Sequence, residues 1–308
     1  MSSKCAAFWH HTNIRSGNRI FPCCRFKTPV ATFDGGLNNI LNSKKYEELR
    51  DSDVSTLWEC QKCMHEESLG KESLRNKFNK EYDTDTISLE YLEIGFDNIC
   101  NAACDGCYPE FSSEWSKILN PNASKGSHII SSEEIISIPD TVRKILFLGG
   151  EPLMTNRHKK LLRMVKDLSL LKIVYNTNGT FLLDDETINL LNQCKEVEFI
   201  LSIDGYGSLN ETVRKNCEWK KIEMFIQQIK NTNYKLSINT VIHKNNYHGI
   251  NELQEYVDQL NVEWSVNILT YPSDLDIANI EDKTKLLEVI TNSRIPNKEA
   301  ILKHANDN

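Results

Sequence analysis

The sequence has no long apolar run and no surplus of basic residues. None of its segments approaches the ~20 consecutive apolar residues that cross a bilayer. We therefore expect no membrane-embedded part. Lysine and arginine number 36 against 43 aspartate and glutamate residues, for a net charge of −7. Because nucleic-acid binding relies on clustered Lys and Arg, this balance argues against nucleic acid as the main partner.

The N-terminus also lacks the apolar segment that directs secretion. We therefore expect a cytoplasmic protein, in which thiols stay reduced and clustered cysteines are metal ligands or catalytic groups rather than disulfides. Cysteines are abundant: there are ten, and eight of them lie within the first 107 residues. This asymmetry indicates two regions of different chemistry.

From about residue 88 the sequence alternates short apolar stretches with helical patterns. Strands are predicted at 89–96, 144–150, 172–179, 198–205, 235–242 and 263–269. Between them, apolar residues recur at helical spacing, as at Leu161, Leu162, Val165 and Leu168. The alternation predicts βαβ units and a parallel sheet. Six units are too few to close an eight-stranded barrel, so we expect an α/β fold with an open or partial barrel.

We expect three segments along the chain. Residues 80–278 form the barrel, and residues 279–308 form one or two terminal helices. Residues 1–79 lack the βα alternation and are rich in cysteine, so they predict a small, loop-rich module. We expect something other than a hydrophobic core to hold this module together.

Three cysteines follow the first predicted strand with the spacing C-x3-C-x2-C, at Cys100, Cys104 and Cys107. A zinc site needs four ligands, usually in pairs. Three thiolates from one loop instead hold three irons of a four-iron cluster and leave the fourth iron open to a small molecule. Parallel α/β folds place their chemistry at the carboxyl ends of strands, where this loop lies. The spacing favours a cluster, with zinc or inert thiols as alternatives.

Together with "GGEP" at 149–152 after the second strand, this motif resembles the radical S-adenosylmethionine (SAM) superfamily. The resemblance covers about residues 88–278. It implies a partial (βα)6 barrel in which the three cysteines hold a [4Fe–4S] cluster and SAM binds the fourth iron. An electron from the cluster then cleaves SAM to a 5′-deoxyadenosyl radical, which abstracts hydrogen from a substrate.

The resemblance also implies contacts with SAM. Gly149 and Gly150 would let the backbone approach its methionine end, and Glu151 would accept from its ammonium group, unless that carboxylate only begins a helix. Strand-end residues Asn176, Ser202 and Asp204 are further candidates, although Asn-Gly and Asp-Gly pairs are also ordinary turns. Many family members have an aromatic residue directly before the third cysteine. This sequence has Gly106 there, so Tyr108 is the candidate for packing near adenine.

The first eighty residues have their own cysteine pattern. It resembles the twitch or SPASM type of auxiliary-cluster module, which normally follows the barrel. The matching positions are Cys5, Gly17, Cys23, Gly36-Leu37-Asn38, Leu49-Arg50, Cys60 and Cys63. The resemblance implies an auxiliary [4Fe–4S] cluster held by Cys5, Cys60, Cys63 and either Cys23 or Cys24. A four-cysteine zinc site has the same number of ligands and remains an alternative to the cluster. Either metal would stabilise the module.

The sequence therefore predicts a radical SAM enzyme that modifies a peptide or small-molecule substrate, with the auxiliary cluster assisting oxidation. It would take electrons from a flavodoxin or ferredoxin type of donor. A radical-based maturase of another protein and a zinc-stapled binding protein without catalysis are the alternatives. Cys217 has no assigned place, although some relatives use a cysteine in that region to donate hydrogen.

Overall fold

A computed structural model describes residues 4–306 except 16, 34–35, 38, 69 and 121–137. Asn38 of the auxiliary pattern therefore lies outside the described residues. The chain divides into two compact units. The first comprises Met1–Asn98, Gly126–Val174 and Glu186–Glu196, and the second comprises Ile99–Lys125, Tyr175–Asp185 and Val197–Asn308. The boundaries expected at residues 79 and 278 remain predictions about sequence modules.

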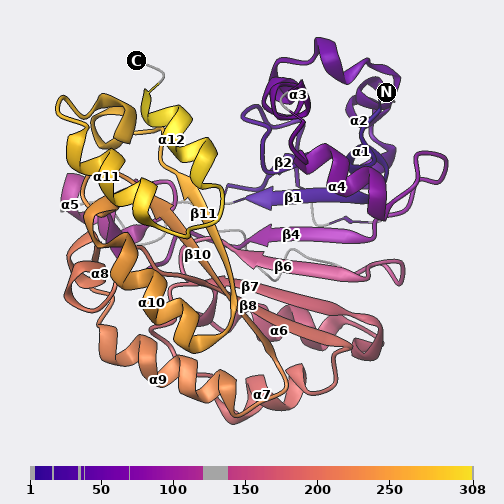
Figure 1. Ribbon diagram of the computed structural model, residues 1–308. Helices are drawn as coiled ribbons and strands as arrows, with labels where there is room; N and C mark the ends of the chain where they lie inside the picture. The colour runs from indigo at the N-terminus through magenta and orange to yellow at the C-terminus, as the bar shows by residue number, and fades with distance from the viewer. Residues whose placement is uncertain are drawn as a thin grey trace. The chain divides into compact units, whose positions relative to one another are not determined.

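The first unit contains a five-stranded part of the sheet, in the order β6-β4-β1-β2-β3. Its strands are β1 (His11–Arg15), β2 (Arg19–Phe21), β3 (Ala31–Thr32), β4 (Tyr91–Gly95) and β6 (Lys144–Leu148). β1 pairs in parallel with β4, and β4 pairs in parallel with β6, so their arrows point the same way in Figure 1. The N-terminal segment thus adds a parallel strand that the sequence analysis did not predict, because "HTNIR" is too polar to read as a buried strand.

The N-terminal segment also has a hydrophobic core, and the expectation that it lacks one is wrong. Its helices are α1 (Ala7–His10), α2 (Lys44–Asp51), α3 (Gln61–Ser68) and α4 (Leu74–Glu81). Aromatic side chains from separate segments pack into one buried cluster, notably Phe8, Phe21, Phe26 and Phe78. Burying such side chains contributes about 1.5–3 kcal/mol each. The aromatic residues are scattered along the chain, so no periodic pattern in the sequence predicted this core.

The second unit contains three parallel neighbours in the order β11-β10-β8. They are β8 (Glu196–Ser202), β10 (Lys235–Ile242) and β11 (Glu263–Ile268), and β7 (Lys172–Thr177) begins in the first unit and ends in the second. Helices α8 (Ser208–Val213), α9 (Trp219–Lys230) and α10 (Ile250–Leu260) separate the strands. The buried face of α9 consists of the predicted apolar residues Ile222, Phe225, Ile226 and Ile229.

All six predicted strands are present, each within two residues of its expected start. One predicted helix is shorter than expected. α6 (Arg157–Met164) buries Leu161 and Leu162 but ends before Val165, and Leu168 begins a separate 3₁₀ turn. The remaining α-helices are α5 (Ser113–Leu119), α7 (Asp185–Leu191), α11 (Thr284–Asn292) and α12 (Lys298–Asn306), the last two being the expected terminal helices. Within the described part of the chain, no helix is both long and apolar enough to cross a membrane.

Candidate functional site

The cysteine loop, residues 100–107, belongs to the second unit and is held by the start of α5. The Cys100 N–H donates to Ser113 Oγ at 3.1 Å, and the Ser113 hydroxyl donates back to the Cys100 carbonyl oxygen at 3.1 Å. Trp115 Nε1 donates to the carbonyl oxygen of Cys104 at 2.8 Å. The side chains of α5 thus fix the loop's backbone and leave its thiols available as ligands.

A short antiparallel pair places an arginine beside the loop. β5 (Ala103–Cys104) pairs with β9 (Arg214–Lys215), and Cys104 lies directly opposite Arg214. Arg214 Nη1 donates to Asp204 Oδ2 at 2.6 Å, and both side chains are largely buried. The other Asp204 oxygen accepts from the Val241 N–H at 2.7 Å. The carboxylate that the sequence analysis assigned to SAM therefore already anchors Arg214, a residue that no sequence motif pointed to.

The surroundings of the loop favour a thiolate at Cys104. A hydrogen bond from the Cys217 thiol, together with the positive charge of Arg214, lowers the pKa of Cys104 below its ordinary value despite burial. Burial raises the pKa of Cys107 to about 11. Thiolates are the metal-binding form of cysteine. Three thiols from one loop, one of them already acidic, fit the donor set of a cluster with an open iron. The structure also gives Cys217 a place, buried beside Cys104.

Polar residues after β7 brace the same loop. Asn178 Nδ2 donates to Asn101 Oδ1 at 2.9 Å, and Asn101 Nδ2 donates to Thr180 Oγ1 at 3.0 Å. This contact explains much of the "NTNG" sequence as loop support. The Oδ1 atom of Asn176 is buried with no hydrogen-bond partner among the described residues, and Ser202 at the end of β8 is half-buried. Asn176 and Ser202 therefore stay candidates for contacts with a polar ligand.

Tyr108, the candidate for packing near adenine, lies in an aromatic group. Its ring contacts Phe111 and Tyr271 with centroid distances of 5.0 and 6.2 Å. The space that a side chain at Gly106 would occupy is filled by Leu269, whose Cδ1 lies 3.0 Å from an ideal Cβ at that position. Leu269, which follows β11, therefore covers the loop at Gly106, where the loop has no side chain of its own. The role of Tyr108 toward SAM stays a prediction.

The GGEP turn, residues 149–152, lies in the first unit, where it is tied to the end of β4. Gly149 has φ +120°, and a Cβ there would lie 2.7 Å from the Asp97 carbonyl oxygen. The Gly150 N–H donates to that same oxygen at 2.9 Å. The Asp97 carboxylate in turn pairs with Arg157 Nε at 3.1 Å. Only glycine fits at 149, because the backbone of another segment passes where its side chain would be.

Glu151 is almost fully buried, at 2 % exposure. Its Oε1 accepts from the Leu153 N–H at 3.1 Å and so caps the 3₁₀ helix Pro152–Met154. This is the helix-start role that stood as the alternative in the sequence analysis. A contact between Glu151 and an ammonium group stays a prediction.

The N-terminal cysteines surround one cavity in the first unit. Cys5, Cys23, Cys60 and Cys63 all line it, together with aromatic and arginine side chains that include Phe8, Phe78, Arg25 and Arg75. Cys24 does not line this cavity and is exposed. The four cysteines come from separate segments: before α1, after β2, and from the turn and helix at α3. Of the two candidates for the fourth ligand, the fold brings Cys23 to the other three.

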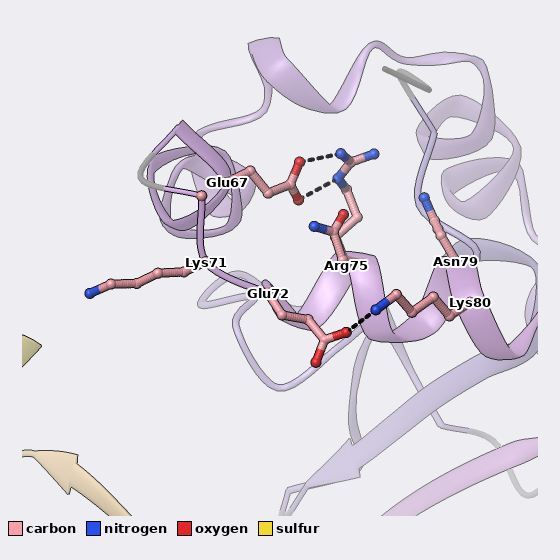
Figure 2. Close-up of a pocket in the computed structure, with 8 residues that line it drawn as sticks. Glu67, Lys71, Glu72, Arg75, Asn79 and Lys80 are labelled. Atoms are coloured by element: carbon pink, nitrogen blue, oxygen red, sulfur yellow. Dashed lines mark hydrogen bonds and ion pairs between the residues drawn. The ribbon is translucent and has the colours of Figure 1, made fainter. Parts of the chain in front are cut away.

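Two arginines at this cysteine cavity are held by neighbouring glutamates of α3. Arg25 makes two hydrogen bonds to Glu66 and a third to Cys63 Sγ at 3.1 Å. Arg75 is paired with Glu67, and both line an adjacent surface pocket (Figure 2). Among the described residues, no three His, Cys, Asp or Glu side chains converge on a single metal ion. A cubane cluster binds each thiolate to a different iron, so this observation concerns mononuclear sites alone.

Comparison with known families identifies the class of protein. A family model described as "Radical SAM superfamily" matches residues 95–257, more than half of the chain. The match spans the cysteine loop, the GGEP turn and the strands through β10. The chain belongs to the radical SAM superfamily, and the expected α/β fold with a mostly parallel sheet is confirmed.

Curated relatives share only part of their length with this chain. It is 29 % identical over 195 residues to "Molybdenum cofactor biosynthesis protein 1" of Dictyostelium discoideum, covering 59 % of this chain but 27 % of that protein. It is 22 % identical over 228 residues to a "Probable GTP 3',8-cyclase" of Sulfurisphaera tokodaii, covering 70 % and 68 %. The "GTP 3',8-cyclase" of Campylobacter lari is 28 % identical over 183 residues, covering 56 % and 51 %.

Solved structures with a similar chain trace include "Native anSMEcpe with bound AdoMet", at 20 % identity and a TM-score of 0.45, covering 58 % of this chain and 52 % of that one. Another is SuiB of Streptococcus suis bound to S-adenosylmethionine, at 19 % identity and a TM-score of 0.46, covering 76 % and 52 %. The twitch or SPASM-like character of the N-terminal segment is not among these findings and stays a prediction.

Proposed function

We propose that this chain cleaves SAM reductively at a [4Fe–4S] cluster held by Cys100, Cys104 and Cys107. The observation that supports this most strongly is the cysteine loop itself. One loop braced by hydrogen bonds offers three thiols, as a cluster with an open iron requires. When bound, the cluster and SAM supply a 5′-deoxyadenosyl radical that abstracts hydrogen from substrate.

The chain's own residues would position these groups and exclude water. In the second unit, Arg214 places a positive charge beside Cys104, and the unpaired Asn176 Oδ1 offers an acceptor to a polar ligand. In the first unit, the GGEP turn presents backbone that no side chain at Gly149 blocks. Contacts of Gly149, Gly150, Glu151, Ser202 and Asp204 with SAM are part of this proposal.

The cysteine cavity would hold a second, auxiliary [4Fe–4S] cluster through Cys5, Cys23, Cys60 and Cys63. Four thiols around one cavity fit a fully ligated cluster, and the hydrogen bond from Arg25 to Cys63 Sγ suits a thiolate. Such a cluster would accept the electron released when a substrate radical is oxidised. A structural zinc ion is the competing occupant, and the metal content decides between them.

The substrate would be a peptide or a small molecule. The names of the curated relatives favour testing one small molecule first, because several are GTP 3′,8-cyclases. If the chain acts on GTP, 5′-deoxyadenosine formation should rise when GTP is added to the reduced protein with SAM. Stimulation by peptides or by another protein, but not by GTP, would instead favour a peptide-modifying enzyme or a maturase.

The proposal is tested by anaerobic purification and single-turnover chemistry. We expect a brown protein with about eight irons, as two four-iron clusters require, and 5′-deoxyadenosine after addition of SAM and dithionite. In cells, a flavodoxin or ferredoxin in the cytoplasm would supply the electron. A colourless, zinc-loaded protein that leaves SAM intact would contradict the proposal and favour a binding protein.

A further inference from the structure

Arg25 brings a fixed positive charge to one sulfur of the cysteine cavity. Its Nη1 donates to Cys63 Sγ at 3.1 Å and to Glu66 Oε2 at 2.8 Å, while its Nη2 donates to Glu66 Oε1 at 3.0 Å. The two charged side chains are 21 % and 23 % exposed. Two parallel hydrogen bonds to one carboxylate hold a guanidinium in a single orientation. The contact with sulfur is therefore built into the fold and does not depend on a flexible surface side chain.

The segments that supply the cysteines also supply this clamp. Cys63 and Glu66 are three residues apart in α3 and so lie on the same helix face. Arg25 follows Cys23 by two residues. Any metal that draws Cys23 and Cys63 together thus brings Arg25 and Glu66 into the same place. The two segments that carry the cysteines therefore also fix the position of Arg25 relative to the Cys63 sulfur.

A second arginine, Arg75, lines both this cavity and an adjacent surface pocket. Arg75 is 5 % exposed and its partner Glu67 is 7 % exposed. Figure 2 shows this pair among the side chains that line the surface pocket, together with Lys71 and the Lys80–Glu72 pair. Cys5, Cys60 and Cys63 are each 7 % exposed, so their sulfurs are shielded from water. A charge at a shielded sulfur acts more strongly than one in water.

We propose that Arg25, oriented by Glu66, is a positioning residue that raises the reduction potential of the cluster held by Cys5, Cys23, Cys60 and Cys63. Reduction adds one electron to the cluster and so makes it more negative. A hydrogen bond and a positive charge at a ligand sulfur stabilise that state. The inference rests on the proposed auxiliary cluster. It adds the direction of electron transfer, because a raised reduction potential favours acceptance of an electron by that cluster.

Two variants of Arg25 separate charge from hydrogen bonding. Arg25→Lys keeps the charge but lacks the planar fork, and Arg25→Gln keeps an N–H donor without the charge. They are made in the full chain with Cys100, Cys104 and Cys107 replaced by alanine, so that one cluster remains. Redox titration with dithionite, followed by EPR, gives the midpoint potential. Arg294→Gln is the matched control, because Arg294 is an exposed arginine paired with Asp258 in the other unit.

We expect the midpoint potential to fall in the order parent, Arg25→Lys, Arg25→Gln, with Arg294→Gln equal to the parent. For Arg25→Gln we expect at least a tenfold smaller equilibrium constant for one-electron reduction, about 59 mV. Unchanged potentials in iron-loaded Arg25 variants would overturn this inference and leave the auxiliary cluster standing. If Arg25→Gln retains no iron, an Arg25→Lys potential equal to the parent's overturns it. A parent that holds zinc or no iron overturns the inference and the auxiliary cluster together.

Discussion

The two cysteine sites of this protein are built in opposite ways. The loop of the second unit offers three thiols from eight consecutive residues, and its shape is fixed by hydrogen bonds to the start of α5. The cavity of the first unit collects four thiols from segments as far apart as Cys5 and Cys63. Three thiols in one loop can hold only three irons of a four-iron cluster, so the motif by itself leaves the fourth iron open. A distributed site closes around its metal and depends on the whole unit being folded.

Their electrostatics differ in the same sense. The pKa of Cys104 is lowered by the Cys217 hydrogen bond and by Arg214. Burial raises the pKa of Cys5 and of Cys60 to about 12. Because a ligand must lose its proton to bind a metal, the lowered pKa favours ligation by Cys104, whereas Cys107 in the same loop has a raised pKa and loses its proton less readily. Burial disfavours the thiolates of Cys5 and Cys60, so a metal bound there would have to drive their deprotonation, and its binding would be tied to folding.

The largest effect should come from emptying the loop. Replacing Cys100, Cys104 and Cys107 by alanine should abolish 5′-deoxyadenosine formation and reduce the iron content from about eight to about four atoms. Iron analysis and chromatography of the reaction mixture measure both. SAM cleavage by the triple variant would show that the open iron lies elsewhere.

The cavity should respond differently. Cys60→Ala combined with Cys63→Ala should remove the N-terminal iron and destabilise the first unit. The double variant should still cleave SAM, but it should no longer oxidise the substrate. Cys24→Ala is the matched control, because Cys24 lies outside the cavity beside a cysteine that lines it. Iron content after reconstitution is the measurement. Loss of iron in Cys24→Ala, but not in Cys23→Ala, would reverse the assignment of the fourth ligand.

The buried ion pair behind the loop should matter for stability. Arg214→Met leaves the Asp204 carboxylate without its partner at 8 % exposure, which typically costs ~3–5 kcal/mol. The urea midpoint of tryptophan fluorescence reports the change. Arg294→Met breaks an ion pair that is exposed on both sides and should cost about 0–1 kcal/mol. Equal effects of the two substitutions would mean that Arg214 has no structural role at the loop.

The GGEP turn should give the smallest effect on stability. Gly149→Ala places a Cβ 2.7 Å from the Asp97 carbonyl oxygen and forces a non-glycine residue into positive φ. Gly70→Ala also has positive φ, but its Cβ would meet no atom within 4 Å. The φ penalty is roughly 1–2 kcal/mol for Gly70→Ala, because φ +70° lies in the left-handed α region, and it is larger for Gly149→Ala, because φ +120° lies outside that region. Thermal unfolding should therefore show Gly149→Ala to be the less stable variant. Equal stabilities would mean that the backbone shifts without cost to separate the added Cβ from the Asp97 carbonyl oxygen.

The sequence predicted the strands well where apolar residues run continuously. The stretch that became β6 has the sequence KILFL, in which four apolar residues follow Lys144, and its Ile145 and Phe147 are buried. β1 was missed because its Asn13 is buried only through a partner 80 residues away, Glu93, to which its Nδ2 donates at 2.6 Å. Polar residues in a buried strand cannot be recognised until the residue that satisfies them is known.

The same reason limits the prediction of the site. The spacing of Cys100, Cys104 and Cys107 was informative because ligands within one loop are close whatever the rest of the chain does. Cys23 and Cys24 are neighbours with identical chemistry, so their spacing could not tell them apart. Arg214 was missed because its position beside Cys104 depends on the pairing of β5 with β9. No periodicity along the chain encodes that pairing.

The amino-acid sequence by itself determined the alternation of strands and helices, the open-ended three-thiol loop and, through these, the superfamily. These features are local, and chain connectivity alone keeps their residues together. Tertiary structure decided that Cys23 is the cysteine that lines the cavity, that Asp204 pairs with Arg214, and that Arg25 donates to the sulfur of Cys63. Each of these depends on side chains from distant segments, which meet only once burial of the apolar core has fixed where those segments lie.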